Sequence, residues 1–320
     1  MLVSAAVEVF FGHTQLGRQL VSPAVAIGNF DGVHLGHRAL IDRARARASA
    51  SGGEATVLTF SPHPAVVLAP DRAPPAICGM TRKLELLAGA GVAVCVVEPF
   101  DRELSQRSPS EFVTDVLAEG LGARHVIVGY DFSFGRGRAG NADTLLELGS
   151  KVGFEVDVIE PVVVAGQAVS SSRVRQAVGA GELEQARALL GRRFDVDGPV
   201  VRGAGRGREL GVPTANIQVA GDLLPPIGIY AVWVHIEGET IARPGAASLG
   251  TNPTFGDAGH VSLEVYLLDF DQDLYDQRCR ITFVAKLRGE RRFADVAQLV
   301  AQMQRDIDDT RQILDHAPPD

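Results

Sequence analysis

The chain has 320 residues, a formal net charge of −8 and 46% hydrophobic residues, which suits about two globular domains with ordinary cores. The acidic excess is spread along the chain, which excludes the basic footprint of a nucleic-acid-binding protein. No apolar run approaches the roughly 18 residues that cross a bilayer, and the opening residues MLVSAAVEVFFG lack the basic region of a signal peptide. Three scattered cysteines indicate reduced thiols, so we expect a cytoplasmic protein.

The first half of the chain alternates apolar runs with helical patterns. Strands are expected at Ala24–Gly28, Ala55–Phe60, Val92–Val97, His125–Gly129 and Phe154–Ile159. Helices are expected at Leu35–Ser51, Thr81–Ala90, Pro109–Glu119, Asp143–Val152 and Ser172–Ala180. This alternation predicts an α/β domain, a parallel sheet with helices on both faces, whose ligand lies beyond the carboxyl ends of the strands.

The first expected strand leads into the run GNFDGVHLGH (Gly28–His37), which places His34 and His37 at the start of a helix. Residues three apart share a face there, beside the unpaired N–H groups that make a helix N-terminus an anion site. Gly32 and Gly36 would let a phosphate chain approach the backbone. One histidine in this place is usually a cap, but the whole pattern resembles the signature of nucleotidyltransferases, which transfer a nucleotidyl group to a phosphate-bearing acceptor.

The common nucleotide-binding motifs are absent or misplaced. Lys83, Lys151 and Lys286 are the only lysines, and none follows a glycine-rich loop as in a P-loop. The run GRGRAG (Gly135–Gly140) satisfies G-x-G-x-x-G, with Asp157 as a possible ribose-binding acid, but five residues separate it from the preceding strand. A dinucleotide-binding fold is therefore the weaker alternative, and an ATP site here would rely on histidine, arginine and backbone amides.

A second phosphate clamp is indicated by the run VSSSRVRQAV. Ser171 and Ser172 precede a helical pattern, and Arg175 follows them by three residues. Serines at a helix start are commonly caps, but an arginine at this spacing suits a triphosphate. The arrangement resembles the second nucleotidyltransferase motif, a serine or threonine pair followed by x-x-Arg, and leaves Arg173 peripheral.

After Leu190 the sequence changes to short extended segments and turns, which predicts a small antiparallel barrel. The extended segments are Ile229–Ile236, Val261–Phe270 and Arg280–Leu287, and the expected separators are Pro225-Pro226, Pro244-Gly245 and Asn252-Pro253. A last amphipathic helix is expected to pack on the barrel through Val296, Leu299, Val300, Met303 and Ile307. We place the domain boundary so that residues 1–187 form the first domain and residues 188–320 the second.

The second domain carries its own candidate site. The loop Arg202–Gly211 (RGAGRGRELG) is rich in glycine and arginine and could wrap a phosphate chain. Thr214 and Asn216, two apart in an extended segment, point the same way and offer oxygen ligands for magnesium. In the alternating run VSLEVYLLDF, Glu264 shares a face with Tyr266 and Leu268, opposite the apolar positions. A mid-strand acid is usually solvent-facing, but at a barrel mouth it could act as a general base.

Over nearly its whole length the chain resembles the family of bacterial bifunctional riboflavin kinase/FMN adenylyltransferases, also called FAD synthetases. In the first half the resemblance is carried by GNFDGVHLGH, TFSPHP (Thr59–Pro64), VGYDFSFG (Val128–Gly135) and SSSRVR. In the second half it is carried by GRGRELGVPTAN, SLGTNPTFG (Ser248–Gly256), LEVYLLDFDQDLY and LRGERRF. It implies a Rossmann-like nucleotidyltransferase domain followed by a riboflavin kinase barrel with a terminal helix. Tyr266 departs from the family, whose members often carry histidine there.

The resemblance implies that the second domain phosphorylates riboflavin to FMN with ATP and the first adenylylates FMN to FAD, releasing pyrophosphate. His34, His37 and Glu264 would be catalytic, Glu264 as the general base, and Thr214 and Asn216 would hold Mg²⁺. ATP and phosphate in the first domain would contact Gly28, Asn29, Phe30, Asp31, His34, Gly36, His37, Ser171, Ser172 and Arg175. A flavin or nucleotide pocket would include His63, Asp131, Phe132 and Phe134. ATP in the kinase would contact Gly203, Gly205, Arg206, Gly207, Arg208, Thr214 and Asn216.

Two other functions remain open on the sequence. One is a nucleotidyltransferase for another phosphate acceptor, such as a pantetheine or nicotinate phosphate, which would leave the second domain unexplained. The other is a flavin-binding protein with an inactive module, which should have lost polar site residues that this chain keeps. The expected partners are the small molecules riboflavin, FMN and ATP, without nucleic acid or membrane, and a homo-oligomer is left open.

Overall fold

The computed structural model describes residues 7–203, 211–219, 223–251 and 261–319. The chain divides into two compact units, which are treated separately. Unit 1 comprises residues 1–74 and 80–170, and unit 2 comprises residues 75–79 and 171–320. Within the described ranges, no helix is both long and apolar enough to span a membrane.

Unit 1 is built on a six-stranded parallel sheet with the order β1-β4-β3-β2-β5-β8. The strands are β1 (Glu8–Phe11), β2 (Ala24–Ile27), β3 (Ala55–Ser61), β4 (Val94–Pro99), β5 (His125–Gly129) and β8 (Glu155–Ile159). The central strands are apolar and buried, as expected for a parallel sheet covered on both faces. All five predicted strands are confirmed, whereas the four-residue edge strand β1 was not predicted.

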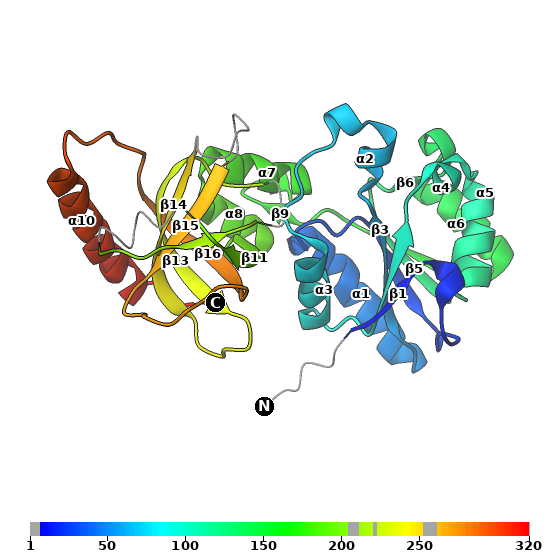
Figure 1. Ribbon diagram of the computed structural model, residues 1–320. Helices are drawn as coiled ribbons and strands as arrows, with labels where there is room; N and C mark the ends of the chain where they lie inside the picture. Colours follow the sequence, from blue (N-terminus) through cyan, green and yellow to red (C-terminus); the bar gives the residue numbers. More distant parts are fainter. Residues whose placement is uncertain (1–6, 204–210, 220–222, 252–260, 320) are drawn as a thin grey trace. The chain divides into compact units, whose positions relative to one another are not determined.

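Helices cover both faces of this sheet, which confirms the predicted α/β architecture (Figure 1). The main helices are α1 (Leu35–Ser51), α3 (Met80–Gly89), α5 (Pro109–Glu111) with the continuous π-helical turn η3 (Phe112–Gly120), and α6 (Ala142–Val152). Shorter elements are η1 (His13–Gln15), α2 (Pro64–Leu68), η2 (Pro70–Arg72), α4 (Arg102–Gln106), β9 (Val163–Val164) and β10 (Gln167–Ala168). Helix α1 packs against β2, β3 and β5.

The strand order positions the candidate ligand site. From β2 the chain proceeds outward through β3 to β4, and it then returns to the other side of β2 to form β5 and β8. The carboxyl ends of β2 and β5 therefore lie side by side where the strand order reverses, and ligands of open parallel sheets bind at such a point. The turns that begin at Gly28 and Gly129 both start at this edge.

The structure excludes the dinucleotide-binding alternative. The run Gly135–Gly140 lies between two short paired strands, β6 (Ser133–Phe134) and β7 (Gly140–Asn141), with the 3₁₀ turn η4 (Arg136–Arg138) between them. It therefore does not join a sheet strand to a helix, as a phosphate-binding turn would. Asp157, the proposed ribose ligand, instead pairs with two arginines of α1.

Unit 2 contains a closed barrel with the order β11-β12-β15-β14-β13-β16. The strands are β11 (Asp195–Val201), β12 (Ala215–Ile217), β13 (Gly228–Ile236), β14 (Arg243–Thr251), β15 (Val261–Leu267) and β16 (Arg278–Arg288). All pairings are antiparallel, so the predicted small barrel is confirmed. The predicted alternation of β15 holds at Leu263 and Val265, which are buried. Leu268 was wrongly assigned to the Glu264 face, because it follows the end of the strand and is buried.

One predicted separator is wrong. Pro244-Gly245 was expected to lie between strands, but both residues belong to β14 and pair with β13 and β15. A Cβ atom at Gly245 would lie 3.0 Å from the Tyr266 carbonyl oxygen and 3.1 Å from a methyl group of Val234. Glycine at this position therefore permits close packing inside the barrel and does not mark a turn.

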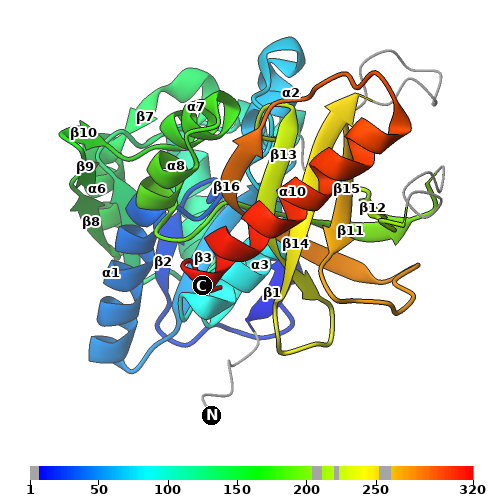
Figure 2. The same ribbon diagram turned by 90° about the vertical axis from the view of Figure 1, so that its left-hand side faces the viewer.

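In the part of unit 2 that the structure describes, the helices are α7 (Ser171–Ala180), α8 (Leu183–Leu190) and α10 (Val296–Asp315). Figure 2 shows α10 lying across the barrel, where it contacts β13, β14 and β16. Its second half is buried at Ile307 and Leu314, but Val296 is 61% exposed and Val300 is 37% exposed. The predicted packing of this helix is thus confirmed for its second half and wrong for these two valines, which are exposed.

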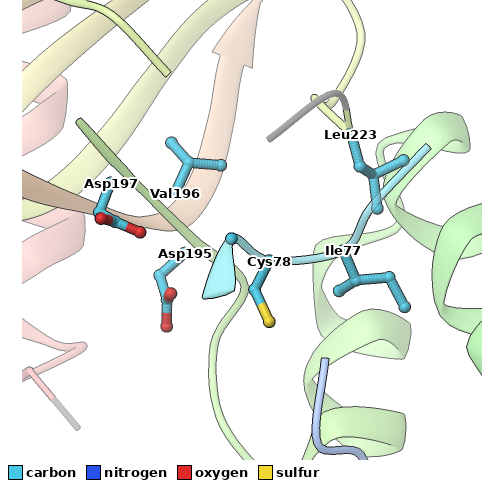
Figure 3. A pocket seen from close by; sticks show the side chains of 7 residues that line it. Ile77, Cys78, Asp195, Val196, Asp197 and Leu223 are labelled. Carbon is cyan, nitrogen blue, oxygen red and sulfur yellow. The ribbon is translucent and has the colours of Figure 1, made fainter. Parts of the chain in front are cut away.

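The short segment of residues 75–79 belongs to unit 2, although it comes from the first half of the sequence. The carbonyl oxygen of Pro75 accepts a hydrogen bond from Nε of Arg175 at 2.7 Å. Ile77 and Cys78 line a pocket together with residues of β11 (Figure 3). Its free volume of about 10 Å³ is that of a single water molecule, so it is no nucleotide site.

Candidate functional site

The turn between β2 and α1 has an unusual backbone. Phe30, Gly32 and Val33 have φ angles of 48°, 78° and 41°, all in the left-handed region. Glycine adopts this region without strain, but phenylalanine and valine rarely do. Phe30 and Val33 are fully buried, so their packing in the core holds the backbone in this conformation. Such strained turns cluster at functional sites.

This turn brings the two predicted histidines into contact. His34 is the N-cap residue of α1, and its Nδ1 accepts a hydrogen bond from the backbone N–H of His37 at 3.2 Å. The two rings stack with centroids 3.6 Å apart and planes 11° apart. A Cβ atom on Gly36 would lie 3.1 Å from the His34 ring, so any larger residue there would push on that ring. Since Nδ1 of His34 accepts, the neutral ring carries its proton on Nε2.

His37 is held without charge in the absence of a ligand. Burial of its ring lowers the pKa of His37 well below the usual value, and the nearby His34 and Lys83 lower it further. Its Nδ1 atom is buried and has no hydrogen-bond partner among the residues that the structure describes. A buried polar atom left unpaired in this way is costly unless a ligand satisfies it. The histidine pair at the start of α1 is therefore suited to an anionic ligand.

Two residues that were not predicted to belong to the site hold the start of this turn. The carbonyl oxygen of Asn29 accepts a hydrogen bond from Nζ of Lys83 at 2.9 Å and one from Oγ1 of Thr59 at 3.0 Å. Thr59 lies in the run TFSPHP, whereas Lys83 lies outside the motifs that carry the resemblance. The signal was present: Lys83 lies three and four residues before the buried Leu86 and Leu87, on the core-facing side of α3.

The remaining predicted residues of unit 1 differ in their accessibility. Asp31 is buried within the turn. Asp131 is exposed just beyond β5, next to the half-buried Phe132. The Phe132 ring stacks on Phe134 with centroids 5.3 Å apart, and Phe134 is buried in the core. His63 caps α2, with its Nδ1 accepting from the Ala65 backbone N–H at 3.1 Å. The role of these four residues in a flavin or nucleotide pocket stays a prediction.

The predicted serine and arginine clamp lies at the start of α7, in unit 2. Ser171 and Ser172 are the first two residues of the helix, and Arg175 is its fifth. Nε of Arg175 donates a hydrogen bond to the Pro75 carbonyl oxygen at 2.7 Å. That these residues meet the histidine pair stays a prediction.

In unit 2 the predicted kinase residues converge on one face of the barrel. Asn216 of β12 lies directly opposite Glu264 of β15, and Ser248 of β14 lies opposite Glu264 on the other side. Oγ1 of Thr214 donates a hydrogen bond to Oε2 of Glu264 at 3.2 Å. The neighbouring residue Val265 is buried in the interior. The half-buried polar residues therefore share the outer face of the sheet.

Hydroxyl, amide and carboxylate oxygens thus meet on this outer face, and an all-oxygen donor set suits Mg²⁺. The backbone of Gly203 lies directly against the Asn216 amide, where any side chain would collide with it. In the described ranges no three His, Cys, Asp or Glu side chains are arranged to hold a metal ion. Thr214 and Asn216 nevertheless fit a magnesium ion that takes its other ligands from water and phosphate. Four predicted ATP ligands, Gly205, Arg206, Gly207 and Arg208, lie outside the described residues.

The comparisons with known proteins cover both units. Residues 18–173 match the family described as FAD synthetase, and residues 190–314 match the family described as riboflavin kinase. The bifunctional riboflavin kinase/FMN adenylyltransferase of Pseudomonas fluorescens is 41% identical over 281 residues, which cover 88% of this chain and 89% of that protein. The corresponding protein of Listeria monocytogenes is 39% identical over 293 residues, covering 91% and 92%. The boundary at residues 187 and 188 falls between the matches and stays a prediction.

A solved structure shares the fold of nearly the whole chain. A crystal structure described as a macrolide-efflux protein from Streptococcus pneumoniae has a TM-score of 0.83 and 28% sequence identity, and the match covers 96% of this chain and 99% of that one. That description belongs to the streptococcal protein alone. The two matched families and the relatives named above instead agree with each other and with both sites. This chain belongs to the family of bifunctional riboflavin kinase/FMN adenylyltransferases.

Proposed function

We propose that the two modules of this flavin-cofactor biosynthetic enzyme act in sequence through the two sites described above. Residues 188–320 would phosphorylate riboflavin to FMN, and residues 1–187 would adenylylate FMN to FAD. The observation that carries the proposal is the Thr214–Glu264 hydrogen bond, with Asn216 opposite Glu264 on the same face. It supports a role for Glu264 as the base and for Thr214 and Asn216 as magnesium ligands, because the three residues lie together on a barrel that matches riboflavin kinase.

In the kinase reaction, Glu264 would accept the proton of the terminal hydroxyl of riboflavin. The hydroxyl oxygen would attack the γ-phosphorus of ATP, and ADP would leave. Thr214 and Asn216 would hold Mg²⁺, which when bound neutralises charge on the phosphates. The hydrogen bond from Thr214 fixes one carboxylate oxygen of Glu264 and so orients the base. A positioned general base typically contributes about 10²–10⁴-fold in rate.

In the adenylylation reaction, a phosphate oxygen of FMN would attack the α-phosphorus of ATP, and pyrophosphate would leave. No covalent enzyme intermediate is required. The start of α1 would direct backbone N–H groups at the phosphates, and His34 would donate from Nε2. The unpaired Nδ1 of His37 would gain a phosphate partner as charge develops. Preorganised donors of this kind are worth about 10²–10³-fold each.

The enzyme would carry out both reactions in the cytoplasm, where ATP is abundant. In support, Cys78, Cys95 and Cys279 are buried and form no disulfide in the described structure, as expected in a reducing compartment.

The test is a time course of purified protein with riboflavin, ATP and magnesium, in which the flavins are separated by chromatography. FMN should appear first and FAD should follow. FMN alone would remove the proposed role of the histidine pair. Absence of both products would contradict the proposal for both sites, and a parallel reaction started from FMN would examine adenylylation separately.

A further inference from the structure

We propose that Lys83 is a positioning residue for adenylyl transfer, which holds the strand-to-helix turn at the Asn29 carbonyl and places a buried positive charge behind the histidine pair. The inference rests on the proposed function of the histidine site and adds a residue from a different element, α3. Lys83 lies outside every motif used above.

The charge of Lys83 is uncompensated in the part of the chain that the structure describes. The residue is 8% exposed, and its ammonium makes one hydrogen bond, to the Asn29 carbonyl oxygen. No described carboxylate lies within ion-pair distance of it. Burial raises the pKa of the neighbouring Cys95 thiol to about 12, so that side chain supplies no negative charge. Burying an unpaired ammonium opposes folding, so its presence calls for a reason other than stability.

The hydrogen bond is placed where it controls the geometry of the site. Asn29 is the second residue after β2, immediately before Phe30, whose φ of 48° begins the left-handed part of the turn. Its carbonyl is fixed from two sides, by Thr59 of β3 and by Lys83 of α3. The same turn ends at His34, whose ring stacks on His37. Movement of the Asn29 carbonyl would therefore displace the histidine pair, and a shift of about 1 Å can cost about 10²-fold in rate.

The positive charge of Lys83 also acts directly on the histidine pair. Burial is the main cause of the low pKa of His37, and the charges of His34 and Lys83 lower that pKa further. Asp31 is the acidic residue of the same turn and is buried. Under the proposed function, the triphosphate of ATP supplies the missing negative charge beside Lys83. Before ATP binds, the site would then have a positive electrostatic potential, which would attract the negatively charged triphosphate.

The first experiment compares two substitutions that affect the same carbonyl. Lys83→Met removes the charge and one hydrogen bond while nearly keeping the side-chain length, and Thr59→Val removes only the other hydrogen bond. With FMN and ATP as substrates, Lys83→Met should lower kcat by about tenfold to hundredfold with KM for FMN changed less than about threefold. Thr59→Val should lower kcat by less than about threefold. Equal effects of the two substitutions, or wild-type kcat in Lys83→Met, would overturn the inference.

Thermal unfolding separates a positioning role from a structural one. Replacing an unpaired buried charge by an apolar side chain is often neutral or stabilising, so Lys83→Met should unfold at the wild-type temperature or above it. Loss of activity together with a lower unfolding temperature would show that Lys83 mainly supports the fold and would contradict the proposal. Loss of activity without loss of stability is the expected result.

A spectroscopic readout does not depend on turnover. In a histidine NMR titration, with the His37 signal assigned by its absence in His37→Gln, the Lys83→Met substitution should shift the His37 titration to higher pH. An unchanged titration would refute the electrostatic part of the inference. If the wild-type protein makes no FAD from FMN, the proposed function fails, whereas a wild-type rate in Lys83→Met defeats only the role of Lys83.

Discussion

A buried ion pair joins the C-terminal helix to the barrel. Arg288 at the end of β16 donates to both carboxylate oxygens of Asp306 on α10, at 2.6 to 3.1 Å. Gln302 donates to the same carboxylate at 2.9 Å. The side chains of Arg288 and Asp306 are only 12% and 7% exposed. We predict that Asp306→Ala destabilises unit 2, although alanine favours a helix more than aspartate does.

The magnitude follows from what the substitution leaves behind. Removing one partner of a buried pair typically costs about 3–5 kcal/mol, because the other charge stays buried without compensation. Arg288 keeps one hydrogen bond, to the Gly289 carbonyl oxygen, which places the loss at the lower end of that range. Alanine favours the helix over aspartate by up to about 0.7 kcal/mol. The net loss in the free energy of unfolding should therefore be about 2–3 kcal/mol.

The chain carries its own probe for this measurement. Trp233, the single tryptophan, lies on β13 and donates from Nε1 to the Ala317 carbonyl oxygen just beyond α10 at 2.8 Å. Tryptophan fluorescence during urea unfolding therefore reports on unit 2. Asp308→Ala is the matched control, since Asp308 lies exposed on the same helix, and should change stability by less than about 0.5 kcal/mol. A loss below about 1 kcal/mol in Asp306→Ala would refute the reasoning.

Three further predictions concern the sites and the sheet. His37→Ala should abolish FAD formation from FMN and leave FMN formation nearly intact, which a flavin time course would show; equal loss of both activities would contradict separate sites. Glu264→Gln should reduce FMN formation by about 10²-fold or more while added FMN is still adenylylated, and failure to use added FMN would indicate coupled modules. Hydrogen bonds from Arg47 and then Arg43 lower the pKa of Asp157 to about 2. Since this pKa lies below the unfolded value, the pair stabilises the fold above about pH 4 by about 1–2 kcal/mol after allowance for exposed arginines, and that stability is lost toward pH 2. Urea unfolding of Asp157→Asn should show a weaker pH dependence than the wild type, and parallel curves would refute this.

Most of the first unit could be predicted because its strands are continuous apolar runs and its helices keep a helical period. The barrel strand β14 could not, because its residues RPGAASLGT contain no bulky alternation. Its small residues permit close contacts with the two neighbouring strands of the barrel, as Gly245 shows against Tyr266 of β15 and Val234 of β13. Local pattern carries no information about such contacts.

The candidate sites were predictable to the extent that their residues lie in one motif. His34 and His37 are three apart in the chain, so a helix start alone places them on one face. The pairing of Asn216 with Glu264 depends on the register of β12 against β15, which the sequence does not state. The resemblance to a family suggested both residues, and only the folded barrel brings them opposite each other.

Lys83 shows why a motif search can miss a residue that influences a site through its charge. A P-loop lysine is found by its sequence because it touches phosphate directly from the loop that holds it. Lys83 comes from a separate helix, donates a hydrogen bond to the Asn29 carbonyl oxygen of the turn, and is buried. Its influence on His37 passes through space and through the backbone, so no fixed spacing to GNFDGVHLGH is required. A lysine on the apolar face of an amphipathic helix is the feature to look for, because burial without a counter-ion is tolerated where a ligand or a mechanism requires the charge.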